Sequence, residues 1–122
     1  MFQLSEKDFD IFKSECLKWI DFFGITEWEI SFSFEYLENA RAECRINWLG
    51  KTCVICLTTC SPKNDKFDLK KSAFHEICEL LLTEMECVSL DEEIPYDERK
   101  GLTESARHSV IRRMENSIFK RL

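Results

Sequence analysis

The spacing of apolar residues predicts an opening helix followed by three short strands. An apolar residue recurs every three or four positions after Ser5, which suits a helix N-cap, and Gly24 is placed to end this helix. From residue 28 the period changes to two, which is the spacing of a half-buried strand. We expect strands over 28–36, 42–48 and 52–59, and the third is apolar on both sides, as a central or covered strand would be.

Two further helices complete the predicted fold. A helix over about 67–87 follows a break at 61–65, and an acidic stretch at 90–98 is interpreted as an exposed loop. Thr103 is expected to cap a final helix that runs to about residue 120, with a buried stripe formed by Ala106, Val110, Ile111, Met114 and Ile118. The predicted class is therefore α+β, with an N-terminal helix, a three-stranded, mostly antiparallel sheet and two C-terminal helices in a single domain over 1–122.

Composition narrows the function classes. The net charge of −6 argues against general binding of nucleic acid, and we interpret a basic cluster on the last helix as a solvated face; it consists of Arg107, Arg112, Arg113, Lys120 and Arg121. No secretory signal and no window of membrane-spanning length is visible. We therefore expect a cytoplasmic protein whose seven cysteines stay reduced.

The helix over 67–87 carries the candidate chemistry. Its pattern His75-Glu76-x-x-Glu79 resembles the zinc-peptidase pattern His-Glu-x-x-His, in which residues four apart lie one above the other and bind one ion. We expect His75, Glu76, Glu79, Thr83 and Glu86 to share a polar arc beside an apolar face of Phe74, Ile77, Cys78, Leu81 and Met85. In this interpretation His75 and Glu79 bind the metal, and Glu76 is the general base that activates the metal-bound water for amide hydrolysis.

The third metal ligand is less well defined. We predict His108 as the third ligand, because it is the chain's one other histidine and lies on the last predicted helix; Glu104 and Glu115, along the same margin of that helix, are the alternatives. The alternative is a purely structural role, in which His75 forms a hydrogen bond with a buried polar group while Glu76 and Glu79 are ordinary solvated carboxylates. Three residues are loosely placed to stabilise an oxyanion, namely Tyr96, Arg99 and Arg112.

The cysteines offer a competing metal site. Cys53-x-x-Cys56-x-x-x-Cys60, with a fourth thiol, has donors for structural zinc or an iron–sulfur cluster. Two cysteines three apart on a strand point to opposite faces, however, whereas a zinc knuckle needs them on a tight turn. We therefore favour small apolar side chains that fill a reduced core.

The chain resembles small zincin-like proteins of phages and bacteria, whose minimal form is a helix, a short sheet, the motif helix and a further helix. The resemblance is carried by the strand that begins Trp28-Glu29-Ile30, by the motif at 75–79, and by the segment 108–116 around His108. It implies a metallopeptidase of the host or bacterial cytoplasm that acts on a peptide or protein, with metal bound by His75 and Glu79 and catalysis by Glu76.

The departure at Glu79 changes what the resemblance implies. A carboxylate gives more charge to the ion than a neutral imidazole, so the bound water is less acidified. Zinc is still favoured, but manganese, iron or nickel becomes more credible. The alternative is a catalytically inactive zincin-like protein that has kept the scaffold and acts as a binding or interaction module.

Overall fold

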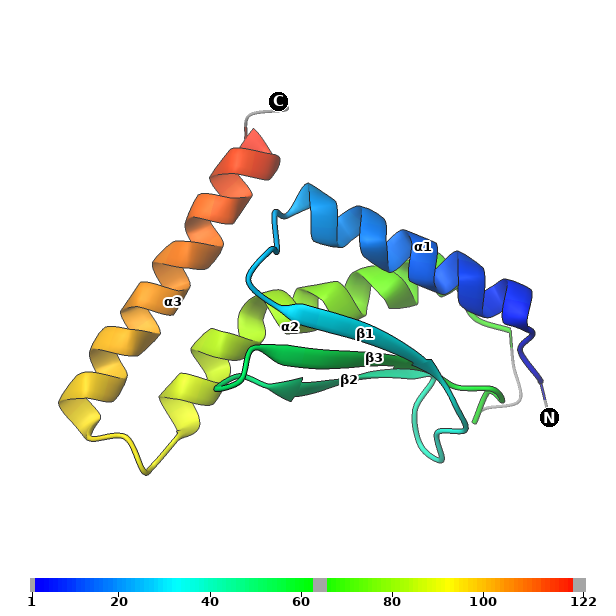
Figure 1. The fold of residues 1–122 in the computed structure, drawn as a ribbon, viewed down its shortest axis with the longest axis horizontal. Helices are drawn as coiled ribbons and strands as arrows, with labels where there is room; N and C mark the ends of the chain where they lie inside the picture. Colours follow the sequence, from blue (N-terminus) through cyan, green and yellow to red (C-terminus); the bar gives the residue numbers. More distant parts are fainter. Residues whose placement is uncertain (1, 63–65, 120–122) are drawn as a thin grey trace.

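The computed structural model describes residues 2–62 and 66–119, the side chains at 84 and 88 excepted. Within these residues it has three helices, α1 (Glu6–Phe22), α2 (Leu69–Leu90) and α3 (Tyr96–Ser117), and three strands, β1 (Glu29–Phe34), β2 (Ala42–Asn47) and β3 (Thr52–Leu57) (Figure 1). The predicted α+β class is confirmed. No helix among the described residues combines the length and apolarity that crossing a bilayer requires.

Local chemistry defines the ends of α1 as predicted. The Ser5 hydroxyl accepts a hydrogen bond from the Asp8 backbone N–H at 3.2 Å, and the Asp8 carboxylate accepts one from the Ser5 backbone N–H at 2.8 Å. This reciprocal capping box satisfies two N–H groups that the first turn leaves without helical partners. Gly24 follows the helix with a φ of +63°, a conformation that glycine adopts without steric cost.

The sheet is mixed, so the prediction of a mostly antiparallel sheet is wrong for one of its two pairings. The strand order is β1-β3-β2, with β1 parallel to β3 and β2 antiparallel to β3. The link 35–41 carries the chain past the place that β3 later fills. Hydrogen bonds hold it there, among them those from Glu35 N–H to Leu57 O and from Thr58 N–H to Arg41 O. As a result β1 and β2 lie on either side of β3, and β2 is the strand against which α2 packs.

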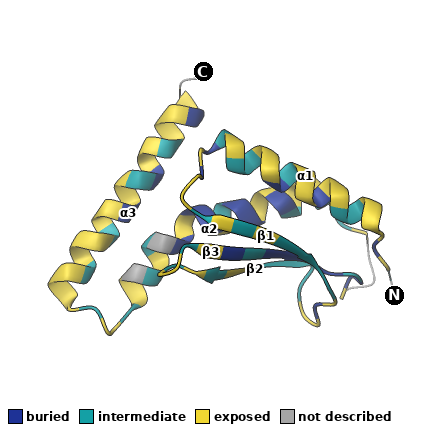
Figure 2. Ribbon diagram, viewed as in Figure 1, coloured by how far each residue is buried: buried dark blue, intermediate teal, exposed yellow. Residues whose placement is uncertain are grey.

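Helices α1 and α2 cover one face of the sheet, called here the inner face, and the core lies between them (Figures 1 and 2). The buried face of α2 is rotated from the predicted one, since it is formed by Ala73, Glu76, Ile77, Leu80, Leu81 and Thr83. Phe74, predicted as apolar core, is 39% exposed and contacts Trp19 and Phe23 of the α1 region. The rotation arises because α2 packs against α1, β2 and α3 at once, and the carboxylate of Glu76 is buried as a consequence.

Helix α3 begins earlier than predicted. Tyr96, assigned to the acidic loop from sequence, opens the helix after Pro95, and the acidic side chains of Asp97 and Glu98 lie in its first turn, where they suit the positive end of the helix dipole. Thr103 is therefore inside the helix rather than at its cap, and its hydroxyl donates to the Arg99 carbonyl at 2.8 Å.

Helix α3 packs along one side only. Ala106 and Val110 are buried, whereas three members of the predicted buried stripe are 42–45% exposed: Ile111, Met114 and Ile118. Near its end, α3 is tied to the turn after α1 by an ion pair between Arg113 and Glu27. Figure 2 shows α3 exposed over most of its length and standing away from the sheet.

Candidate active site

A polar pocket of about 300 Å³ opens where the link between β1 and β2 meets the N-terminal half of α2. Helix α2 contributes His75 and Glu76, the first two residues of the motif. The complete lining is Asn39, Ala40, Arg41, Ala42, Pro62, Ser72, His75 and Glu76. The motif therefore borders a cavity at the edge of the sheet, beside β2.

Glu76 is the buried member of the motif. Its residue is 6% exposed, although it carries a carboxyl group. Its pKa is raised to about 6, mainly because burial removes the carboxylate from water; His75 opposes the shift, and the carboxylates of Glu79 and Glu43 add to it. A carboxyl group with this pKa changes protonation state close to neutral pH, which is what a general base requires.

His75 and Glu79 lie one helical turn apart on the exposed side of α2. The His75 Nε2 atom is 3.3 Å from the Glu79 Oε1 atom, and the two side chains are 68% and 52% exposed. Two ligand atoms of a tetrahedral zinc ion lie about 3.3 Å apart, because each bond to zinc is about 2.0–2.1 Å long. This pair therefore has the spacing of two metal donors, and equally that of an ordinary pair of residues four apart on a helix.

The third ligand is not in place. Within residues 2–62 and 66–119, no group of three or more His, Cys, Asp or Glu side chains is arranged to hold a metal ion. The structure thus brings together His75 and Glu79 but does not bring His108, Glu104 or Glu115 to them. His108 is an exposed residue of α3. The described residues fit two positions of a zinc site and do not fit the three-ligand site predicted from sequence.

The cysteine motif is divided between the two faces of the sheet. Cys53 belongs to the core on the inner face, whereas Cys56 lies near the charges of Arg45, Glu35 and Glu43 on the opposite, outer face. This arrangement confirms the expectation that residues three apart on the strand diverge. A second thiol, Cys44 on β2, approaches Cys53 on the inner face with 3.0 Å between the two sulfur atoms.

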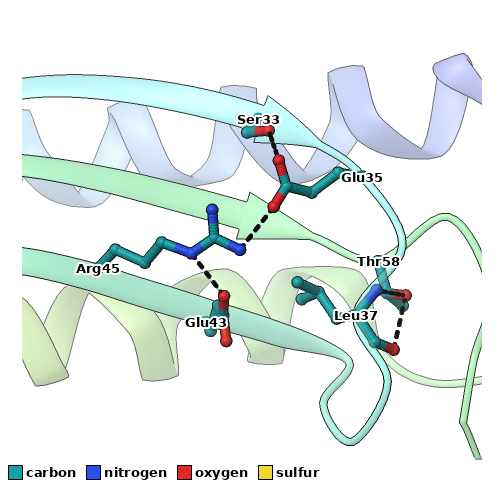
Figure 3. Close-up of polar contacts among 6 residues, drawn as sticks. All are labelled: Ser33, Glu35, Leu37, Glu43, Arg45 and Thr58. Atoms are coloured by element: carbon teal, nitrogen blue, oxygen red, sulfur yellow. Dashed lines mark hydrogen bonds and ion pairs between the residues drawn. The ribbon is translucent and has the colours of Figure 1, made fainter.

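The outer face of the sheet holds a charged network that is separate from the pocket (Figure 3). Arg45 reaches from β2 across β3 and donates to Glu35 at 2.5 Å and to Glu43 at 2.7 Å. The Ser33 hydroxyl also donates to Glu35, at 2.7 Å. These hydrogen bonds lower the pKa of Glu35, with Ser33 as the largest contributor. The side chains are substantially exposed, as is typical of ion pairs on a solvated sheet surface rather than of an active site.

Several pocket residues were missed from sequence. Arg41 is one of them, and its guanidinium lies 5.2 Å from the centroid of the Phe67 ring. A single arginine in a link between strands has no pattern that distinguishes it from a solvated residue.

Two residues considered from sequence as oxyanion stabilisers, Tyr96 and Arg99, line a different cavity at the start of α3. Of the basic cluster on α3, Arg113 pairs with Glu27, and residues 120 and 121 lie outside the described residues.

Comparisons with family models, curated proteins and solved structures found no match to this chain. The resemblance to zincin-like proteins stays a prediction, and a functional assignment must come from the pocket itself.

Proposed function

We propose that this protein is a hydrolase that cleaves peptide bonds at the His75–Glu76 pocket, with Glu76 as the general base. One observation carries the proposal: a carboxyl group that is 6% exposed, with its pKa raised to about 6, lines a polar pocket beside the edge of the sheet. A buried carboxyl group is costly for a fold to retain unless it has a use.

The proposed step uses the Glu76 carboxylate, a water molecule and the peptide bond of the substrate. The Glu76 carboxylate takes a proton from water as the water oxygen attacks the peptide carbonyl carbon. The carbon–nitrogen bond then breaks, and the proton held by Glu76 passes to the leaving nitrogen, which yields a carboxylic acid and an amine. Because the described residues supply two metal donors and not three, this step is assigned to Glu76 and water alone.

An extended peptide is the substrate that the neighbouring strand suits. β2 is one of the two edge strands of the sheet, and no other described strand pairs with the side of β2 that faces away from β3. Since Thr58 N–H donates to Arg41 O, the alternation of an antiparallel pair turns the N–H and C=O groups of Ala42, Cys44 and Ile46 away from β3. A peptide that added to this edge would lie beside the pocket, because Ala42 is part of its lining.

The same edge supports a second candidate function, a peptide-binding module without cleavage. Strand addition draws its affinity from main-chain hydrogen bonds and needs no catalytic group. The two functions differ in what Glu76 does. It is essential for a hydrolase and dispensable for a binding module.

A matched pair of variants tests the proposal. Glu76→Gln and Glu79→Gln make the same chemical change three residues apart on α2, one buried and one exposed. In a library of fluorogenic extended peptides, we expect Glu76→Gln to lower kcat/KM by about 10²- to 10⁴-fold, while Glu79→Gln keeps most of the activity. Equal rates for the wild type and Glu76→Gln would contradict the assignment. Peptide binding with no cleavage by the wild type would favour the binding module.

A reducing compartment is part of the proposal. All seven cysteines are free thiols in the structure, and four of them are buried. Proteins that persist with many free thiols are typical of the cytoplasm, where thiol reductants maintain them.

A further inference from the structure

Two thiols meet on the inner face of the sheet, at the junction of β2 and β3. Cys44 pairs in register with Ile55, and Cys53 pairs with Ile46, so the two cysteines are diagonal neighbours. Their sulfur atoms are 3.0 Å apart. For comparison, the Cys16 thiol lies 4.0 Å from the Ala73 carbonyl oxygen to which it donates. The Cys44–Cys53 contact is therefore much closer than another sulfur contact in the same core.

The two thiols of this pair have different environments. Cys53 is 1% exposed, whereas Cys44 is half-buried on the edge strand. A hydrogen bond joins the two sulfur atoms, and either thiol can be its donor; the contact lowers the pKa of Cys53 and raises that of Cys44. Burial and the negative charges of Glu76 and Glu79 raise the pKa of Cys44 further. The first proton that the pair loses thus leaves a thiolate at Cys53, with a thiol in contact with it.

We propose that Cys44 and Cys53 form a redox-modification site, at which a small peroxide converts the two thiols into a disulfide that links β2 to β3. A peroxide is the class of oxidant that the site suits, because it is small and reacts with thiolates, and the pair lies next to an edge strand on which Cys44 is only half-buried. This inference goes beyond the proposed hydrolase and does not depend on it.

The reaction balances in two steps. The Cys53 thiolate attacks one peroxide oxygen, and the oxygen–oxygen bond breaks. Hydroxide departs, and Cys53 becomes a sulfenic acid. The Cys44 sulfur then attacks the Cys53 sulfur, the sulfur–oxygen bond breaks, and the oxygen leaves as water with the proton from Cys44. The two thiols lose two hydrogen atoms, and the peroxide is reduced to two waters. The sulfur atoms must approach by about 1 Å to reach the disulfide bond length.

The other cysteines are less suited to this reaction. Burial is the main cause that raises the pKa of Cys16, to about 12, and the pKa of Cys56, Cys78 and Cys87 is also raised by burial. Among the cysteines with a shifted pKa, Cys53 is the one for which it is lowered. Cys56, three residues along the same strand, faces the Arg45 network on the other side of the sheet. The fold therefore selects Cys53 over its neighbours as the reactive thiol.

Oxidation would act close to the candidate active site. Cys44 is two residues from Ala42, which lines the pocket, and it lies near the carboxylates of Glu76 and Glu79. A disulfide would fasten the edge strand to its neighbour beside that pocket. A thiol reductant would release the strand, so the modification is reversible.

Peptide mapping tests the site directly. The reduced full chain is treated with hydrogen peroxide, its remaining thiols are alkylated, and it is digested with trypsin without reductant. Cleavage after Arg41, Arg45, Lys51 and Lys63 places Cys44 in the peptide 42–45 and Cys53 in the peptide 52–63. We expect an intact mass lower by two hydrogen atoms and a link between these two peptides, which fragmentation assigns to Cys53 rather than Cys56 or Cys60.

Three variants sharpen the result. Cys44→Ser should leave a sulfenic acid on Cys53 that dimedone traps, whereas Cys53→Ser should abolish the link and slow oxidation by roughly tenfold. Cys78→Ser is the matched control and should keep the link. The same treatment of the urea-unfolded chain should lose the selectivity, because the fold creates it. The proposal is overturned if the native chain keeps its mass, if the link joins other cysteines, or if dimedone traps nothing on Cys53 in Cys44→Ser.

Discussion

Glu76 and Glu35 lie on opposite faces of the sheet, and their pKa values are shifted in opposite directions. On the inner face Glu76 lies on the buried side of α2, with further carboxylates as neighbours, and its pKa is raised to about 6, mainly by burial. On the outer face Glu35 is exposed and accepts hydrogen bonds from Ser33 and Arg45, which lower its pKa (Figure 3).

The contrast shows how one small sheet separates two kinds of acid. Arg45 and Ser33 stabilise the charge of Glu35, so this carboxylate is a weak base. The environment of Glu76 destabilises its charge, so this carboxylate takes up a proton readily near neutral pH. Only the second arrangement is suited to general base catalysis, and it is the one that borders a pocket.

The pH dependence of activity should give the largest effect. Glu76 acts as a base only when it is deprotonated, so kcat/KM should rise with pH and level off above its pKa of about 6. Below that value the rate should fall about tenfold for each pH unit. A pH profile of peptide cleavage measures this, and Glu79→Gln should move the inflection to lower pH, because the Glu79 carboxylate raises the pKa of Glu76. A profile that is flat through pH 6 would contradict the assignment.

Stability should depend on pH through the same group. Glu76 has a higher pKa in the folded chain than the ordinary 4.5, so the folded state binds its proton more tightly than the unfolded state. The stabilisation by this proton is fully present below about pH 4.5 and is lost as the pH rises through about 6.

Urea unfolding of the wild type and Glu76→Gln across this range gives the measurement. Relative to the variant, the wild type should lose about 2 kcal/mol of unfolding free energy between about pH 4 and pH 8. The change with pH is the informative quantity, because any constant effect of the buried amide cancels. A difference that does not vary with pH would show that Glu76 has an ordinary pKa.

Metal binding distinguishes the two-donor pair from a complete zinc site. With His75 and Glu79 as the two donors, zinc should bind weakly, and His75→Ala should lower the affinity by roughly tenfold or more. His108→Ala should have no effect, since His108 does not join the pair. Isothermal titration with zinc measures both. Loss of binding in His108→Ala would show that α3 moves to complete the site predicted from sequence.

The smallest effect is expected on the outer face. Arg45→Ala removes the cation that contacts Glu35, so the pKa of Glu35 should rise toward its ordinary value, while thermal unfolding should change little because exposed ion pairs contribute little. The pKa of Glu76 should stay raised. NMR titration of both carboxyl groups measures this, and a matching shift at Glu76 would show that the two faces are coupled.

Much of the local structure could be predicted from sequence. The N-cap at Ser5, the end of the first helix before Gly24 and the three strands follow from short-range rules, and the structure confirms them. The N-terminus of α3 was misassigned, because acidic residues next to a proline suit both an exposed loop and a first helical turn. The prediction of a mostly antiparallel sheet was wrong for the parallel β1–β3 pair, because alternation identifies a strand but not its neighbour.

The candidate site was predictable only in part. Helical spacing alone places His75 and Glu79 side by side, and the structure has them 3.3 Å apart. Helical spacing does not show that His108 on α3 lies apart from this pair, because two helices joined by a short loop can diverge at many angles. The contact between Cys44 and Cys53 was missed for a similar reason, since it depends on the register between two strands.

The sequence by itself determined which residues form helices and strands and which side chains share a turn of α2, since these depend on groups a few residues apart. Tertiary structure alone decided that Glu76 is buried, that Glu79 three residues away is exposed, and that two cysteines meet beneath the edge strand. The physical reason is that a pKa or a thiol contact depends on excluded water and on charges brought close by packing. The distances between these charged groups and thiols are set only when α2 packs against α1, α3 and β2.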